Sequence, residues 1–256
     1  MAGHSHSSNI KFRKDRVDSK RAKTFAKLSR MITVAARLGG GSLDHNARLR
    51  LCVDKARVLS MPKDGIDRAI KKGTGEGDLG NYEEVLYEGY GPGGVAMMLE
   101  ILTDNRHRTA ADVRMVMEKH GGNLGTSGAV AWMFERRGRF VIAAETDAAA
   151  PRLDGDRLLE LVLQVGADDL VEEGDQATIL CAATAFAEVQ QALAARGVSL
   201  ASAELAYVPN QRTVVADPAV ATRLVKLIDD LEDNDDVQTV FSNEDFPDDV
   251  VKVLEQ

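Results

Sequence analysis

The 256-residue sequence is poor in the residues that mark several classes of protein: it has two cysteines, one tryptophan and no long apolar run. Cys52 and Cys181 lie far apart and neither has a CxxC partner, which argues against a disulfide framework and against a zinc site. No stretch approaches the roughly 18 apolar residues of a membrane span, and the polar start of the chain excludes an ordinary secretory signal. We therefore expect a cytoplasmic protein with no membrane partner and no bound metal.

Nucleotide-binding motifs are also missing. Residues 89–94 satisfy GxGxxG, but they precede a predicted strand rather than a helix and Pro92 occupies the turn, which excludes dinucleotide binding. No GxxxxGKS or GxxxxGKT sequence occurs. Residues 122–125 have the GxxG form that can clamp phosphate, yet a glycine between a helix and a strand more commonly ends the helix. We expect neither a cofactor nor a small-molecule substrate.

A net charge of −8 conceals two oppositely charged parts. Residues 1–72 contain 18 Lys and Arg against 6 Asp and Glu, a net charge of +12, whereas the remainder carries −20. Because bound cations release condensed counterions from phosphates, the first part meets the electrostatic requirement for binding a nucleic acid. The acidic remainder should repel the same polymer. The alternative is that the basic part docks on the acidic body of its own chain.

Three short helices are predicted in the basic part, at residues 19–38, 46–60 and 62–73, each with a polar cap or proline at its start and glycine or a polar turn at its end. In the first helix an apolar face lies opposite a face of Lys and Arg, so the apolar face should pack and the basic face should remain in solvent. The apolar face comprises Phe25, Leu28, Ile32, Ala35 and Ala36.

The cations of this helical domain are the candidate nucleic-acid-binding residues. Lys and Arg predominate, and the Asn and Gln residues that read adenine are scarce, so contact with the phosphate backbone is better supported than sequence readout by a helix-turn-helix. For the last two lysines of the third helix, stabilisation of the helix dipole is an equal alternative. The candidates are Lys11, Arg13, Lys14, Lys20, Lys23, Lys27, Arg30, Arg37, Arg48, Arg50, Lys63, Arg68, Lys71 and Lys72.

The acidic body alternates between predicted strands and helices. Residues 139–208 have the order β-α-β-β-α-β, which is one ferredoxin-like unit. The flanking segments predict a second such unit, with strands at 94–102, 129–135, 212–216 and 237–241 and helices at 106–120 and 218–231. The fold class is therefore α+β, with a basic three-helix domain followed by two ferredoxin-like domains, the second inserted into the first. The expected boundaries are 1–78, 79–136 together with 210–256, and 137–209.

A polar segment at residues 103–109 lies between a strand and a helix and is a candidate secondary site. One of its first polar side chains should cap the helix, and its arginines should form a small basic spot on the acidic body. An enzyme centred on Asp104 and His107 is the least favoured alternative, because no second carboxylate pair or nucleophile accompanies them. The candidates for the secondary site are Asp104, Asn105, Arg106 and Arg108.

Two further features have structural interpretations. Trp132 is expected in the core of a strand. The acidic run at residues 229–236 lacks the glycine and terminal glutamate of an EF-hand, so we do not expect it to bind a cation. Carboxylates at the carboxyl end of a helix are electrostatically unfavourable, which indicates a basic partner such as the amino-terminal domain itself.

Several motifs resemble the YebC/PmpR family. They include MAGHS at the start, NARLR at 46–50, MPKDGIDRAIKKGTGEG at 61–77 and YEGYGPGGVA at 87–96. TDNRHRT at 103–109, GGNLGTSGAVAWMF at 121–134 and LIDDLEDNDDVQTVFSN at 227–243 extend the resemblance over nearly the whole chain. The family start usually reads MAGHSKWANIK, so His6 and Ser7 here replace a charge and a stacking aromatic, although Phe12 could stack instead.

The resemblance implies a three-domain, non-enzymatic regulator of gene expression, usually described as a DNA-binding transcriptional regulator. Mitochondrial relatives are translational activators of a cytochrome oxidase subunit, and family members are linked to ribosomes that stall on proline-rich sequences. The leading hypothesis is therefore a DNA-binding transcriptional regulator, and the second is a translation factor that binds ribosomal RNA. In both hypotheses the basic domain binds the nucleic acid and the acidic domains contact a protein partner.

Overall fold

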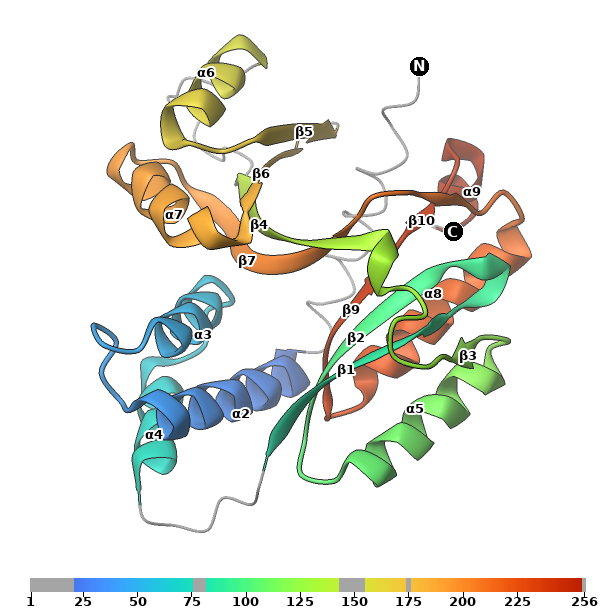
Figure 1. Cartoon of the computed structure of the whole chain (residues 1–256), viewed down its shortest axis with the longest axis horizontal. Helices are drawn as coiled ribbons and strands as arrows, with labels where there is room; N and C mark the ends of the chain where they lie inside the picture. The colour runs from blue at the N-terminus through green and yellow to red at the C-terminus, as the bar shows by residue number, and fades with distance from the viewer. Residues whose placement is uncertain (1–20, 76–81, 143–154, 174–175, 255–256) are drawn as a thin grey trace.

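The computed structural model describes residues 21–75, 82–142, 155–173 and 176–254. A helical part leads into two four-stranded antiparallel sheets, and helices cover one face of each sheet. The predicted fold class, a multidomain α+β chain with a basic three-helix part and two α/β units, is confirmed. Figure 1 shows the helical part beside the two sheets, with the amino-terminal end of α2 directed toward them.

The helical part consists of α2 (Arg21–Gly39), α3 (Ala47–Val58) and α4 (Lys63–Thr74). The predicted apolar face of α2 packs against Leu49, Val53 and Ala56 of α3 and Ile66 of α4. As expected, Asn46 caps α3: its Oδ1 accepts the N–H of Leu49 at 3.0 Å, and its amide donates to two carbonyls at the end of α2. The same side chain therefore begins one helix and ends the other.

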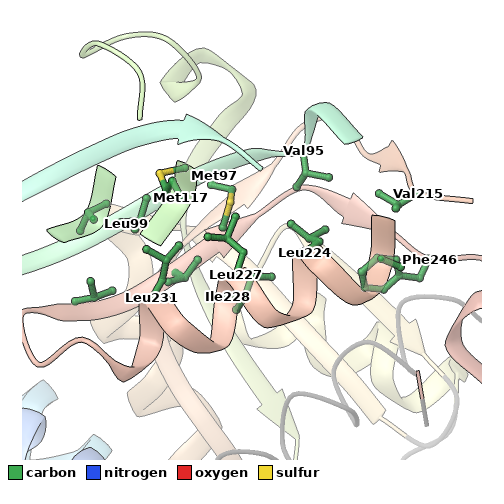
Figure 2. Close-up of a cluster of buried hydrophobic side chains, with 14 of the residues drawn as sticks. Val95, Met97, Leu99, Met117, Val215, Leu224, Leu227, Ile228, Leu231 and Phe246 are labelled. Atoms are coloured by element: carbon green, nitrogen blue, oxygen red, sulfur yellow. The ribbon is translucent and has the colours of Figure 1, made fainter. Parts of the chain in front are cut away.

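The outer sheet has the strand order β3-β1-β2-β9, formed by β1 (Glu83–Tyr90), β2 (Ala96–Thr103), β3 (Asn123–Leu124) and β9 (Val237–Ser242). Helices α5 (Arg106–Lys119), α8 (Pro218–Asp233) and α9 (Asp248–Leu254) pack on one face. Figure 2 shows Met97 and Leu99 of β2 directed toward Leu227 and Leu231 of α8. The apolar run of β2 is buried on both faces, because alternate residues face the helices and the inner sheet.

The inner sheet has the order β5-β6-β4-β7, with every neighbouring pair antiparallel. Its strands are β4 (Phe134–Ile142), β5 (Asp169–Glu173), β6 (Gln176–Ala182) and β7 (Leu200–Pro209). Helices α6 (Gly155–Val165) and α7 (Phe186–Ala195) cover one face and bury Phe140, which stacks on Phe186 at 4.8 Å. The order of elements is the β-α-β-β-α-β order predicted for residues 139–208.

The outer unit departs from its predicted strands. Strand β1, rich in glutamate, was not predicted and takes a central place in the sheet. The predicted strand at 212–216 is only β8 (Thr213–Val214), which pairs in parallel with β10 (Glu244–Asp245) in a separate two-stranded sheet. Where separate strands were predicted at 129–135 and 139–143, residues 134–142 form one strand, β4, and the short 3₁₀ helix η2 (Ala131–Met133) precedes it.

The reason that residues 129–133 do not form part of a strand is the carboxylate of Glu88. It accepts the backbone N–H groups of Gly128, Val130 and Ala131 at 2.7–2.8 Å. These donors are consumed by a side chain, so they are not available for a sheet ladder. The expectation that Trp132 lies in a strand core is wrong for the same reason: it follows this clamped turn and is 67% exposed.

Candidate nucleic-acid interface

The basic face of α2 contacts the acidic body, contrary to the expectation that it remains in solvent. Lys27 Nζ donates to the carbonyl of Glu232 in the last turn of α8. Arg30 donates to the carbonyl of Asp235 at 2.7 Å and to the carboxylate of Asp236 at 3.1 Å. Lys23 lies 3.5 Å from the carboxylate of Asp233. The residues that join α2 to the end of α8, which we call the α2–α8 contact, are Lys23, Lys27, Arg30, Glu232, Asp233, Asp235 and Asp236.

The physical reason for the α2–α8 contact is the surplus of negative charge at the end of α8. Carbonyl groups in the last turn of a helix have no partner within it, and acidic side chains there oppose the helix dipole. The cations of α2 satisfy the carbonyl of Glu232 in that turn and the carbonyl of Asp235 just beyond the helix, and they offset the carboxylates. The expected basic partner of the acidic run is therefore the amino-terminal domain, and the alternative of docking within the chain is confirmed for these residues.

A second set of ion pairs joins α3 to both sheets. Arg48 pairs with Glu84 of β1, and Lys55 Nζ lies 3.1 Å from Glu204 of β7, which also pairs with Arg139 of β4. Burial alone would raise the pKa of Glu204, but Lys55 and Arg139 outweigh burial and lower that pKa to about 2. Of the fourteen candidates, Arg48 therefore joins Lys23, Lys27 and Arg30 as a residue that contacts the acidic body in this structure.

The exposed candidates gather on α4 and near the ends of α2 and α3. At about 100° per residue the four cations of α4 span half of its circumference, opposite the buried Ile66 and Ala69. Helix α4 lies on the side of α2 that is away from the sheets (Figure 1). Lys11, Arg13, Lys14 and Lys20 lie outside the described residues. Outside the α2–α8 contact, the exposed candidates are Arg37, Arg50, Lys63, Arg68, Lys71 and Lys72, of which Arg50 also donates to the carbonyls of Leu43 and Asp44.

The candidate secondary site at residues 103–109 is organised around a buried carboxylate on another element. Asn105 is the cap of α5, accepting the N–H of Arg108 at 3.1 Å. Asp104 pairs with Arg108 at 2.7 Å, and Arg106 lies 3.7 Å from Glu83. His107 is exposed. A cap from this segment, as the sequence predicts, is confirmed; Asp104 pairs with Arg108 within the segment, and Arg106 and Arg108 pair with carboxylates outside it.

Asp236 is the carboxylate that sequence reasoning missed. It accepts the hydroxyls of Thr109 and Thr103 at 2.7 and 3.2 Å and the guanidinium of Arg108 at 3.0 Å, while Arg30 reaches its other oxygen. Burial alone would raise the pKa of Asp236, but these hydrogen bonds lower it. Among the residues the structure describes, no group of three or more His, Cys, Asp or Glu side chains could hold a metal ion.

Trp132 is presented to solvent by a firmly held turn. Its Nε1 donates to the carbonyl of Ala129 at 3.2 Å, and the hydroxyl of Tyr90 donates to the same oxygen. The carboxylate of Glu88 fixes the adjoining backbone by accepting its N–H groups. Burial would raise the pKa of Glu88, but the hydrogen bonds from these N–H groups lower it. The turn therefore has a defined shape and an exposed indole.

Replacing Trp132 with alanine should change the free energy of unfolding by less than about 0.5 kcal/mol, because the side chain is mostly outside the packed core. Urea unfolding followed by far-ultraviolet circular dichroism measures this change without relying on the lost fluorophore. The matched variant Trp132→Phe should behave alike. A loss near 3 kcal/mol, the cost of truncating a buried aromatic, would restore the core assignment.

The three parts also enclose a cleft of about 610 Å³ between α3, the outer sheet and the inner sheet. Charged groups of both signs line it, among them Lys55, Glu100 and Arg136. Burial raises the pKa of Glu100, although Lys55 opposes the shift. In the described portion of the chain, no helix has the length and apolar character needed to cross a membrane.

Comparison with known proteins shows which protein family the sequence matches. Residues 5–76 match the model of the TACO1/YebC protein N-terminal domain, and residues 82–244 match that of the TACO1/YebC second and third domain. A "Probable transcriptional regulatory protein" of Halothermothrix orenii is 49% identical over 99% of both chains. Another protein of the same name, from Syntrophotalea carbinolica, is 50% identical over 97% of both chains.

A solved structure gives the same result for the fold. The crystal structure of a conserved hypothetical protein from Aquifex aeolicus matches with a TM-score of 0.80 and 41% identity. The match covers 91% of this chain and 93% of that one. Together with the two domain models, these similarities identify the chain as a member of the TACO1/YebC family.

Proposed function

We propose that this protein is a non-enzymatic, cytoplasmic regulator of gene expression that binds the phosphate backbone of a nucleic acid through the exposed face of α4. The observation that carries the proposal is the position of Lys63, Arg68, Lys71 and Lys72, which are exposed on a helix directed away from the acidic body. There a polyanion meets cations without approaching the carboxylates of the sheets. Regulation is the role that the names of the relatives give to those proteins.

DNA is the first candidate for the polymer, because the relatives are named as transcriptional regulators. The sequence of α4 contains Lys and Arg but no Asn or Gln, which favours backbone contact over base readout. Backbone contact suits RNA equally well, so a translation factor bound to ribosomal RNA is the second candidate. The acidic domains, whose cations are few, would then contact a protein partner.

The test is the salt dependence of binding. Replacing Lys63, Arg68, Lys71 and Lys72 with glutamine should weaken binding and reduce the slope of log K against log salt by up to about 4. Fluorescence anisotropy with labelled duplex DNA and with labelled ribosomal RNA fragments measures both quantities. An unchanged slope would contradict the assignment to α4.

A matched control removes the same number of cations from the acidic body. Arg114, Arg223, Lys226 and Lys252 are exposed there, and their replacement by glutamine gives the same net charge. Binding by the control should stay close to that of the unaltered protein. Crosslinking in cells followed by sequencing then separates the two polymers: promoter DNA supports transcription, and ribosomal RNA supports translation.

A further inference from the structure

We propose that Lys23, Lys27 and Arg30 of α2 form a second phosphate-binding face, which the acidic turn at residues 232–236 covers in this structure, so that a nucleic acid competes with the turn for it. The inference rests on the proposed function and extends it from α4 to α2. The three cations follow one another at intervals of four and three residues, which places them on one side of the helix.

The covering turn offers these cations the chemistry that a phosphate backbone offers. Two carbonyl oxygens, of Glu232 and Asp235, and two carboxylates, of Asp233 and Asp236, approach the three side chains. A nucleic acid presents anionic oxygens in the same role, and Lys and Arg are the residues that bind them. The turn therefore occupies the face as a substitute anion.

The α2–α8 contact consists of interactions that a nucleic acid could replace. The Lys23–Asp233 pair is about half exposed, and exposed ion pairs contribute little to stability. Burial lowers the pKa of Lys27 to about 8, against the opposing effect of Glu232, Asp235 and Asp233, so its ammonium is poorly solvated here. An open hollow of about 480 Å³ adjoins the contact. Lys23, Arg30 and Tyr82 line it, with the Tyr82 ring 5.6 Å from the Arg30 guanidinium, and five aspartates line it as well, Asp104, Asp112, Asp233, Asp235 and Asp236. Two of the three cations therefore border the hollow, while the aspartates around them oppose the approach of a polyanion as long as the contact is closed.

The experiment weakens the cover by removing two of its negative charges, and it leaves Asp236, which also holds residues 103–109, intact. In the double variant Asp233→Asn and Asp235→Asn, affinity for a labelled nucleic acid should rise roughly tenfold near 0.1 M salt, and the salt slope should steepen by up to about 3. Adding Lys23→Gln, Lys27→Gln and Arg30→Gln to that variant should remove the gain. Circular dichroism confirms that each variant is folded.

A matched control distinguishes two causes of a gain in affinity: exposure of Lys23, Lys27 and Arg30, and a general decrease in the repulsion between the protein and the nucleic acid. Glu118 and Glu135 are exposed on other elements, and their replacement by glutamine changes the net charge equally. An equal gain in this control, or no gain in the Asp233 and Asp235 variant, would overturn the proposal while leaving binding by α4 in place. Absence of binding by the unaltered protein would instead reject the proposed function.

Discussion

Replacing Glu204 with alanine is expected to lower the free energy of unfolding by about 3–5 kcal/mol, because it leaves two cations together without their shared carboxylate. Lys55 lies 3.1 Å from Glu204 Oε2, and Arg139 binds the other oxygen. The Glu204 side chain is only 17% exposed. Since Lys55 belongs to α3, the change should also loosen the attachment of the helical part to the inner sheet.

Urea unfolding monitored by circular dichroism checks this loss. Glu172, exposed on β5 of the same sheet, supplies the control, and its replacement by alanine should change stability by less than about 0.5 kcal/mol. Converting Lys55, Arg139 and Glu204 together to methionine should recover most of the loss, because an apolar set removes the unpaired charges. If the free energy of unfolding of Glu204→Ala lay within about 1 kcal/mol of that of the unaltered protein, water would have to reach Lys55 and Arg139 freely.

The same carboxylate predicts a dependence of stability on pH. Its pKa falls from 4.5 when unpaired to about 2 in the folded chain, because the two cations outweigh burial. A lowered carboxyl pKa gives stability that is complete above pH 4.5 and is lost as the pH falls toward 2, in total about 3 kcal/mol. The difference in stability between the unaltered protein and Glu204→Gln should therefore shrink steadily from pH 5 to pH 3.

Local signals in the sequence predicted most helices and the inner sheet. The cap at Asn46 and the alternation of residues 139–208 depend on neighbours along the chain and are found as predicted, and of the polar residues expected to cap α5 it is Asn105 that does so. Strand β1 escaped prediction because it is rich in glutamate and its apolar residues do not alternate: Val85 and Tyr87 pack on one face and Leu86 and Tyr90 on the other. Glu88 then acts at a distance of about forty residues on the turn before Trp132, which no local pattern can indicate.

The candidate interface was predictable only in part for a similar reason. Amphipathicity separates the cations of α2 from its apolar face, and that separation is correct. It does not reveal which exposed face another part of the chain will cover, because the contact between α2 and the end of α8 joins residues about 205 positions apart. The clue available in the sequence was the excess of carboxylates at the end of a helix, where a cation is favoured.

Replacing Asp236 with alanine is expected to lower the free energy of unfolding by about 2–4 kcal/mol, because its carboxylate joins three elements at a site that is 8% exposed. It receives the hydroxyls of Thr103 and Thr109 at the junction of β2 and α5, together with Arg108 of α5 and Arg30 of α2. Its removal leaves the two threonine hydroxyls with each other, 2.8 Å apart, and with the backbone of Asn105. The junction and the α2 contact should weaken together.

Two comparison variants make this expectation specific. Asp236→Asn keeps an acceptor of the same shape and loses the charge, so it should show roughly half of the destabilisation. Asp104→Ala removes an exposed partner of the same Arg108 and should cost less than about 1 kcal/mol. Thermal and urea unfolding give the order of stability, and hydrogen exchange of α2 amides reports the contact with Arg30. If Asp104→Ala proved as damaging as Asp236→Ala, the segment at 103–109 would owe its order to its own ion pair, and Asp236 would not be the group that holds it.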